Sequence, residues 1–375
     1  MKVNKLEPFR LEEYLAKWEF HARYLFCTSD LESRRISDVL DLLPESDRKE
    51  FLDLPLSYTT TDGDENLRQE ISKSYDTIAS DQVLCTAGAE EAIYLAGKSL
   101  LESTDHVISI SPGYQSLQSV AASICETSEV DLDLKDGQWS LDVSKIASAV
   151  RGNTRALFIN FPHNPTGFMP EKIQFLEILE LARKNGLIVF SDEVYREMEL
   201  DPSSRLPAAS DVYENAISLG VMSKSYGFAG LRIGWVASQN KSLLRKLGDY
   251  KHYLSICNSA PSEWLATAIL RHKKRILNEN HQMLMENYRL LRDYFKSRSD
   301  LFQWIDPKGG CTAYPRYLGP EKIIDLADIL VREKGVLILP SSVYGQNNQH
   351  FRVAFGRKNC KESLSKFSEF FASRS

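Results

Sequence analysis

The stretch Ala156-Leu-Phe-Ile-Asn-Phe-Pro-His-Asn-Pro-Thr-Gly-Phe168 joins a short apolar run to a loop that contains two prolines and a glycine. The apolar run, bounded by these turn residues, predicts a β-strand. Because proline fixes its own backbone, the loop should be rigid and should hold the Asn164 amide outward. Open α/β sheets bind ligands at the carboxyl ends of their strands. Taken alone, however, the loop also fits an ordinary Pro/Gly turn.

Similar apolar runs rich in β-branched residues recur on both sides of this stretch, at residues 106–110, 187–191, 216–220 and 232–237. Amphipathic segments with helical spacing lie between several of them. One of these covers residues 171–185 and ends before Gly186, where a helix C-cap belongs. This alternation predicts an α/β fold with a mostly parallel central sheet and helices on both faces.

The length of 375 residues exceeds what a single hydrophobic core usually serves. We expect a large domain over residues 51–280 and a smaller α+β domain built from residues 1–50 and 281–375. One helix over about residues 261–298 should join them, spanning roughly 50 Å at 1.5 Å per residue.

Composition excludes several classes of protein. The net charge of −5 lacks the basic excess of a nucleic-acid binder, and residues 272–275 (His-Lys-Lys-Arg) fit a solvated helix face better than an anion patch. No run of 18 apolar residues and no leader pattern is present, so we expect a cytoplasmic protein without a membrane partner. The six cysteines are scattered without metal-ligand spacing, which predicts reduced thiols and no metal site.

Two further segments carry polar side chains at predicted strand ends. Asp192 ends one apolar run, where a carboxylate is costly to bury unless it meets a cation, and Tyr195 can face the same cavity. Lys224 follows the next run among small residues, where desolvation could lower its pKa into the range of a nucleophile. Each segment alone also fits a surface turn or a solvated lysine.

Together these segments resemble the fold-type I aminotransferases of class I/II, which use pyridoxal 5'-phosphate. Asn164 is followed 28 residues later by Asp192, then 32 residues later by Lys224 and eight residues later by Arg232. The resemblance covers about residues 55–360. It implies an enzyme of amino-acid metabolism or biosynthesis that binds this cofactor, an amino acid and a 2-oxo acid.

The resemblance also implies a role for each residue. Lys224 should form a Schiff base with the cofactor and later act as the base that moves the substrate α-proton. Asp192 should pair with the pyridine nitrogen, keeping it protonated so that the ring can accept electrons. Tyr195 and Asn164 should hydrogen-bond the phenolic oxygen, and Arg232 offers a fork to the phosphate.

Residues 86–93 (Thr-Ala-Gly-Ala-Glu-Glu-Ala-Ile) should supply further phosphate donors, because a small-residue turn that opens a helix presents free N–H groups. An ordinary helix N-cap would look the same. Ser223 could add a hydroxyl, but Val221 stands where the family often has a phosphate-binding serine. By resemblance, the turn consists of Gly88, Ala89 and Glu90.

The remaining site residues rest on the same resemblance. Tyr114 should stack on the pyridine ring, and Tyr58 should reach the phosphate of a neighbouring subunit, which implies a homodimer with shared active sites. Arg352 should bind the substrate α-carboxylate as a bidentate pair. Residues 309–314 should line the substrate side chain.

Transfer of the amino group of an L-amino acid to a 2-oxo acid is the default reaction in this family. However, residues 18–20 (Trp-Glu-Phe) and 29–33 resemble the opening of capreomycidine synthases and arginine oxidases. Glu19 and Asp30 are then candidates to hold a guanidinium, although solvated helix and turn residues fit equally well. The alternative reaction is cyclisation, elimination or replacement, or oxidation of a cationic amino acid such as arginine or hydroxyarginine. The oxidases place a functional histidine where this chain has Glu32 and Ser33.

A third reading is a non-catalytic protein that has kept the fold. Intact Lys224 and Asp192 argue against it, because a scaffold needs neither of them.

Overall fold

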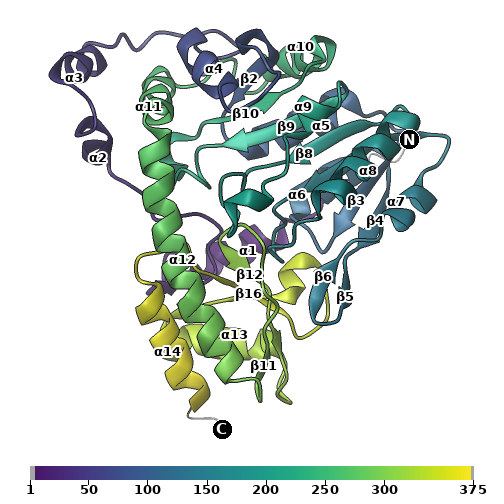
Figure 1. Cartoon of the computed structure of the whole chain (residues 1–375), viewed down its shortest axis with the longest axis vertical. Helices are drawn as coiled ribbons and strands as arrows, with labels where there is room; N and C mark the ends of the chain where they lie inside the picture. The colour runs from purple at the N-terminus through teal and green to yellow at the C-terminus, as the bar shows by residue number, and fades with distance from the viewer. Residues whose placement is uncertain (1–4, 373–375) are drawn as a thin grey trace.

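The computed structural model describes residues 5–372, and its centre is a seven-stranded sheet with the order β2-β10-β9-β8-β7-β3-β4 (Figure 1). Neighbouring strands are parallel except where β10 pairs antiparallel with β2 and β9. The α/β fold with a mostly parallel sheet is therefore confirmed. The strands are β2 (Val83–Thr86), β3 (His106–Ser111), β4 (Glu126–Asp131), β7 (Thr154–Asn160), β8 (Ile188–Asp192), β9 (Ala216–Val221) and β10 (Gly234–Ala237).

Strand register brings the polar strand ends together at one edge of the sheet. Asn160, the last residue of β7, lies opposite Asp192, the last residue of β8. Gly234, the first residue of the reversed strand β10, lies opposite both Val221 at the end of β9 and Thr86 at the end of β2. The segments that precede β10 and follow β2, β7, β8 and β9 therefore meet at this edge.

Helices cover both faces because alternate strand residues point in opposite directions. Phe158 and Phe190 pack into a core that includes helices α5, α6 and α10, whereas Leu157 and Val189 pack against α7 and α8. Burying side chains of this size stabilises the fold by about 1.5–3 kcal/mol each. The helices are α5 (Ala89–Leu100), α6 (Gln115–Ala122), α7 (Val143–Ala149), α8 (Lys172–Lys184), α9 (Ala209–Val212) and α10 (Lys241–Lys251).

A third apolar cluster lies over β2 and β10. It includes side chains of α4 (Glu65–Ser72) and α11 (Ala260–Arg271), together with Val39 and Leu43. Val39 belongs to α2 (Ile36–Leu40), which precedes α3 (Glu45–Leu52). Figure 1 shows α2 and α3 at the outer side of α11, where Phe51 of α3 packs on Trp264 of α11 with 5.1 Å between ring centroids.

The single helix predicted over residues 261–298 is wrong, because the chain forms two helices with a break at His272. His272 has φ −105° and ψ 13°, outside the helical range, and separates α11 from α12 (Lys273–Ser297). No proline or glycine marks the break; instead α11 packs on the sheet cluster, and α12 runs down to the C-terminal strands (Figure 1). Tertiary packing has overridden local helix propensity here.

The N- and C-terminal segments build a smaller α+β region beside the sheet. Strand β1 (Tyr24–Leu25) pairs in parallel with β14 (Val336–Leu337), and β16 lies between β12 and β15. Two further strand pairs are β5 with β6 and β11 with β13. The other elements are α1 (Arg10–Trp18), β5 (Asp133–Lys135), β6 (Gln138–Ser140), β11 (Phe302–Gln303), β12 (Thr312–Ala313), β13 (Arg316–Tyr317), α13 (Ile323–Lys334), β15 (Leu339–Pro340), β16 (Phe351–Ala354) and α14 (Cys360–Ala372).

All six cysteines are free, and five of them are buried. Within residues 5–372, no group of three or more metal-ligating side chains could hold an ion. The same residues contain no helix with the length and apolar character that a membrane crossing needs.

Candidate active site

A cavity of about 140 Å³ opens where the strand ends meet. Its walls include most of the residues that the sequence predicted for the site, from loops far apart in the chain. The lining residues are Ala89, Glu90, Ile93, Tyr114, Asn160, Asn164, Asp192, Val194, Tyr195, Ser223, Lys224 and Arg232.

Asp192 lies at the floor of this cavity and is almost fully buried. Its Oδ1 accepts a 3.2 Å hydrogen bond from the Val194 backbone N–H. Burial raises the pKa of the Asp192 carboxyl to about 7, against the lowering influence of Val194 and of the Lys224 ammonium. Such a carboxylate is suited to pair with a cationic group that enters the cavity.

Lys224 carries the only amine among the residues that line this cavity. Its Nζ donates a 3.0 Å hydrogen bond to Ser29 Oγ and lies 5.7 Å from the centre of the Tyr195 ring. Burial lowers the pKa of the Lys224 amine, although Asp30 acts in the opposite direction. The lysine thus has the desolvated setting of a nucleophile.

The Tyr195 hydroxyl is buried and faces the Ser29 hydroxyl, but it makes no hydrogen bond of good geometry with any described residue. Burial also raises the pKa of this phenol well above its ordinary value. Because a buried polar atom without a partner is costly, the hydroxyl is suited to bond a ligand in the cavity.

Asn160, which the sequence analysis did not single out, fixes the loop that carries Asn164. Its Oδ1 accepts a 2.8 Å hydrogen bond from the Asn164 backbone N–H, and its Nδ2 donates to the Asp192 carbonyl at 2.9 Å. The position of Asn160 at a strand end was the signal that could have identified it.

Arg352, in β16, approaches the site from the smaller region. Its Nη1 donates to Asn164 Oδ1 at 2.9 Å, and its Nε donates to the Cys27 carbonyl at 2.9 Å. Arg352 is only 1% exposed, so its charge lies in the interior beside the cavity. Two of its five N–H donors are used in these bonds.

The turn at Gly88 has the geometry of an anion seat. Gly88 is the N-cap of α5 with φ 89°, and a Cβ there would lie 2.6 Å from Nη2 of Arg232. The first N–H groups of α5 have no acceptor within the helix and mark its positive end. Val221, by contrast, is a buried core residue of β9 and offers no hydroxyl.

Tyr114 forms one wall of the cavity. Its hydroxyl donates to Glu90 Oε2 at 3.2 Å, and the Ser116 hydroxyl donates to Glu90 Oε1. Burial raises the pKa of the Glu90 carboxyl. The ring of Phe9 packs against Tyr114 with 5.4 Å between centroids, which places the start of α1 over this wall.

Five predicted residues do not line the cavity of the single chain: Gly88 and Arg352, which adjoin it as described above, and Asp30, Glu19 and Tyr58. Both carboxylate oxygens of Asp30 accept hydrogen bonds of 2.9 Å from Arg357 Nη2. Glu19 is the C-cap of α1, and burial, Glu12 and Asp30 raise the pKa of its carboxyl. Tyr58 is 85% exposed.

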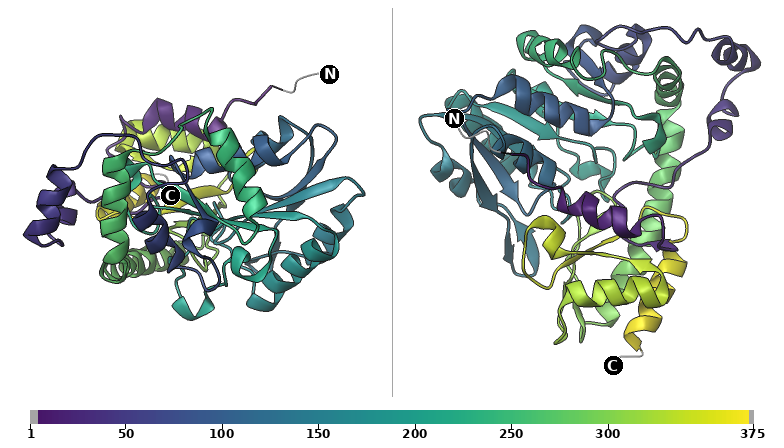
Figure 2. Two further views of the ribbon diagram at one scale, coloured as in Figure 1. Left: turned by 90° about the horizontal axis from the view of Figure 1, so that it is seen from above. Right: turned by 180° about the vertical axis from the view of Figure 1, so that it is seen from behind.

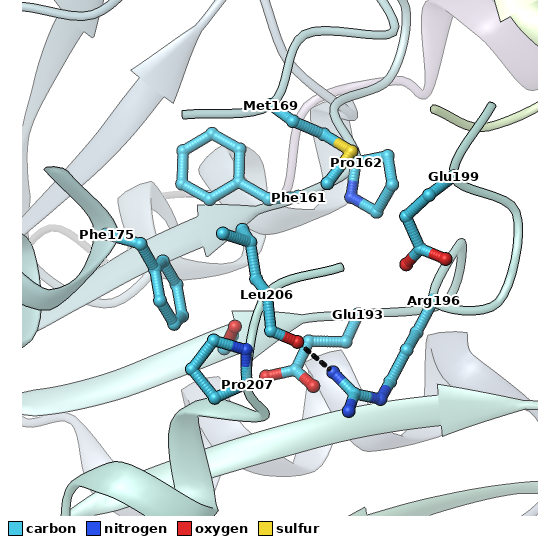
Figure 3. A pocket seen from close by; sticks show the side chains of 10 residues that line it. Phe161, Pro162, Met169, Phe175, Glu193, Arg196, Glu199, Leu206 and Pro207 are labelled. Carbon is cyan, nitrogen blue, oxygen red and sulfur yellow. Dashed lines mark hydrogen bonds between the residues drawn. The ribbon is translucent and has the colours of Figure 1, made fainter. Parts of the chain in front are cut away.

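A second, much smaller cavity lies behind the strand that ends at Asp192 (Figure 3). Its volume of about 10 Å³ leaves room for roughly one water molecule. Glu193 Oε1 accepts a 2.7 Å hydrogen bond from Ser218, and Arg196 Nη1 donates to the Leu206 carbonyl at 2.6 Å. These hydrogen bonds hold the loop between Asp192 and Arg196 on the side that faces away from the larger cavity. The small cavity itself does not contain Asp192 or Lys224 and is not part of the candidate active site.

The larger cavity fits pyridoxal 5'-phosphate. It offers a desolvated amine on Lys224, a buried carboxylate on Asp192 and a buried hydroxyl on Tyr195. The Gly88 turn and the adjacent Arg232 would hold the phosphate.

Comparisons with known proteins agree with this arrangement. The sequence profile of the family described as aminotransferase class I and II matches residues 46–366. Capreomycidine synthase of Streptomyces vinaceus is 26% identical over 367 residues, which is 96% of this chain and 92% of that protein. A probable aspartate aminotransferase of Methanocaldococcus jannaschii is 25% identical over 327 residues, 84% of this chain and 85% of that protein.

Solved structures show the same fold. A PLP-dependent aminotransferase from Streptococcus suis superposes with a TM-score of 0.93 at 29% identity, covering 98% of each chain. The PLP-dependent cyclase OrfR superposes with a TM-score of 0.90 at 24% identity, covering 99% of this chain and 98% of its own. The chain described here therefore belongs to the class I and II aminotransferase family of pyridoxal-phosphate-dependent enzymes.

Proposed function

We propose that the protein is an aminotransferase that moves the amino group of an L-amino acid to a 2-oxo acid. The observation that carries this proposal is the grouping of the Lys224 amine, the Asp192 carboxylate and the Tyr195 hydroxyl around one cavity. Aspartate aminotransferases among the relatives support this reaction.

Each of these side chains has a defined task in such a reaction. Pyridoxal phosphate, when bound, supplies the electron-accepting ring that makes the substrate α-proton acidic. Lys224 takes up and returns this proton at its Nζ. The Asp192 carboxylate would hold a proton on the ring nitrogen of the bound cofactor, and Tyr195 and Asn164 would orient the ring through its phenolic oxygen.

Arg352 is proposed to bind the carboxylate that the amino acid and the 2-oxo acid share. Its Nε and one Nη1 proton are used by Cys27 and Asn164, so N–H donors of the guanidinium remain for a forked pair with a carboxylate. Both half-reactions need the same carboxylate position, and a single fixed guanidinium provides it.

We also propose a homodimer in which Tyr58 completes the neighbouring site. Tyr58 and Tyr253 are 85% and 90% exposed, which is unusual for two large aromatic side chains. Thr59 Oγ1 donates to the Asn258 carbonyl at 3.4 Å, which ties together the two segments that carry these tyrosines. Asn258 in turn donates to the Thr86 carbonyl at 3.0 Å, so this surface adjoins the Gly88 turn.

A cytoplasmic location is a further part of the proposal. The six cysteines form no disulfide, which is typical of proteins in a reducing compartment.

A second candidate is cyclisation, elimination, replacement or oxidation of a cationic amino acid. The similarity to capreomycidine synthase over 96% of the chain favours it. Glu12 and Glu19 are seven residues apart on the same face of α1, whose start packs on Tyr114 through Phe9. Against it, the carboxylate of Asp30 is already paired with Arg357.

Isotope transfer tests the proposed function. The purified protein with added pyridoxal phosphate is supplied with single ¹⁵N-labelled amino acids and 2-oxoglutarate, and ¹⁵N-glutamate is measured by mass spectrometry. We expect label in glutamate for the wild type and for Lys246→Ala, an exposed lysine on α10, and none for Lys224→Ala. Ammonia, a cyclised product or oxygen consumption without labelled glutamate would favour the second candidate.

A further inference from the structure

Residues 26–32, here called the N-terminal strap, cross from the smaller region to the loop that carries Lys224. The Phe26 carbonyl accepts a 2.9 Å hydrogen bond from the Ala354 N–H, and the Glu32 N–H donates to the Gly356 carbonyl at 2.8 Å. The strap is therefore bonded at both ends to β16 and the residues that follow it. Figure 2 shows α1, which precedes the strap, lying between the sheet and the smaller region.

The middle of the strap is held by two arginines. The Cys27 carbonyl accepts a hydrogen bond from Arg352 Nε at 2.9 Å. Asp30 forms its two 2.9 Å hydrogen bonds with Arg357. Ser29 lies between these two anchors, so its backbone has little freedom to move.

Close packing against two glycines fixes the distance between the strap backbone and the loop that carries Lys224. A Cβ on Gly356 would lie 2.5 Å from the Asp30 carbonyl oxygen, and a Cβ on Gly227 would lie 2.8 Å from the Glu32 carbonyl oxygen. Only glycine allows the backbone to approach this closely at either position. Gly227 is three residues from Lys224, so the strap lies directly against the lysine loop.

The Ser29 hydroxyl is the group that the strap presents to this loop. It accepts the 3.0 Å hydrogen bond from Lys224 Nζ, although 195 residues separate the two side chains in the sequence. Within residues 5–372, Ser29 is the one hydrogen-bond acceptor of the Lys224 amine. The resemblance noted at residues 29–33 includes this serine, but it indicates no contact between Ser29 and Lys224.

We propose that Ser29 is a positioning residue that holds Lys224 Nζ in place whenever the amine is not bonded to the cofactor. The proposal rests on the proposed function, because it takes Lys224 as the group that bonds the cofactor and moves the proton. A hydroxyl oxygen binds an ammonium more strongly than a neutral amine, so Ser29 also favours the protonated form of Lys224. The strap thereby connects the arginine proposed to hold the substrate carboxylate with the lysine that acts on the same substrate.

The charged groups around Lys224 determine how the pKa of its amine should change when the Ser29 hydroxyl is removed. Asp30, Cys311 and Asp192 favour the protonated amine, whereas burial and Arg352 disfavour it. Tyr195 contributes its ring face at 5.7 Å, and its hydroxyl faces the Ser29 hydroxyl, which lowers the pKa of the phenol. Without the Ser29 hydroxyl, the protonated amine loses a hydrogen bond, and its pKa should fall.

The test compares Ser29→Ala with Ser29→Thr, which retains a hydroxyl, and with Ser33→Ala, which removes an exposed hydroxyl just beyond the strap. The rate at which cofactor-free protein takes up pyridoxal phosphate is followed by absorbance across pH. We expect the midpoint of this profile to move down by about one pH unit in Ser29→Ala, since a hydrogen bond to a charged group is worth about that much. We also expect kcat to fall about tenfold with KM nearly unchanged. Ser29→Thr should restore both values, and Ser33→Ala should match the wild type.

The outcomes separate this proposal from the proposed function. An unchanged midpoint and kcat in Ser29→Ala would overturn the role of Ser29 even if nitrogen transfer is normal. A lower melting temperature with an unchanged midpoint would show that Ser29 only anchors the strap, which also overturns it. If the wild type takes up no cofactor, or takes it up equally well as Lys224→Ala, the proposed function itself is wrong.

Discussion

Arg352 Nη1 lies 2.9 Å from Asn164 Oδ1, although 188 residues separate these side chains in the sequence. The contact joins β16 of the smaller region to the loop after β7 of the central sheet. The amide of Asn164 therefore faces the proposed carboxylate-binding arginine as well as the cavity. A change at either residue should alter the affinity for substrate as well as the position of the cofactor ring.

Replacing Arg352 with lysine should weaken the binding of every substrate that carries an α-carboxylate. Lysine keeps the positive charge but cannot form the forked pair, so we expect KM for both the amino acid and the 2-oxo acid to rise about 10- to 100-fold. Steady-state kinetics with each substrate varied separately would measure this effect. Arg316→Lys, on an exposed position of β13, is the matched control and should leave both KM values unchanged. A normal KM in Arg352→Lys would remove the arginine from the carboxylate site.

Asp192 should make the stability of the cofactor-free protein depend on pH. Burial raises the pKa of its carboxyl from the ordinary 3.8 to about 7, so the folded state binds this proton more tightly than the unfolded state. Its contribution to stability is thus fully present below about pH 4 and is lost as the pH rises to about 7. The change corresponds to about 4 kcal/mol in the free energy of unfolding as an upper bound.

Urea denaturation of the wild type and Asp192→Asn at pH 4.5 and pH 7.5 would check this prediction. The wild type should lose stability relative to the variant at the higher pH, because the asparagine does not ionise. Other carboxyl groups contribute equally to both proteins and cancel in the comparison. Equal pH dependence in the two proteins would contradict the raised pKa.

Glu19 provides a test of the second candidate function. If the enzyme acts on a cationic amino acid, Glu19→Gln should raise KM for arginine about five- to tenfold and leave KM for alanine unchanged. Glu13→Gln, on an exposed position of the same helix, is the matched control. Equal effects on arginine and alanine would show that Glu19 has no part in selecting the side chain.

Subunit mixing can show whether Tyr58 acts on the neighbouring site. Lys224→Ala has no active lysine, and Tyr58→Ala lacks the proposed phosphate contact, so each homodimer should have low activity. In a mixed dimer, one site would combine the intact lysine of one subunit with the intact tyrosine of the other. Activity should therefore recover to about half of the wild-type value in purified mixed dimers, or to about a quarter in an unseparated one-to-one mixture, measured after co-refolding or co-expression. No recovery would place Tyr58 outside the neighbouring site.

Much of the site could be predicted from the sequence because its residues stand at strand ends. Asn164, Asp192 and Lys224 each follow an apolar run, and parallel strands bring such positions to one edge of a sheet. Hydrophobic periodicity and turn residues mark the strand ends within each short segment, so a single sequence is enough to locate them.

Contacts between distant segments could not be predicted in this way. The hydrogen bond between Ser29 and Lys224 depends on the path of the strap, and the pattern at residues 29–33 does not show which residue Ser29 contacts. The break at His272 likewise depends on tertiary packing, while the local sequence favours one continuous helix. Helix α11 packs in the cluster over β2 and β10, and α12 contacts that cluster at Ile276 before it reaches the main core at Leu284. Residue spacing describes the local backbone geometry of one segment. The Ser29–Lys224 contact and the break at His272 form only when segments distant in the sequence pack together.

The strap at residues 26–32 precedes the residues that the family profile matches, 46–366, yet it contacts the reactive amine through Ser29. None of the strap residues lines the cavity itself. A substitution in this short segment can therefore change the setting of the lysine while every side chain that faces the cofactor stays the same.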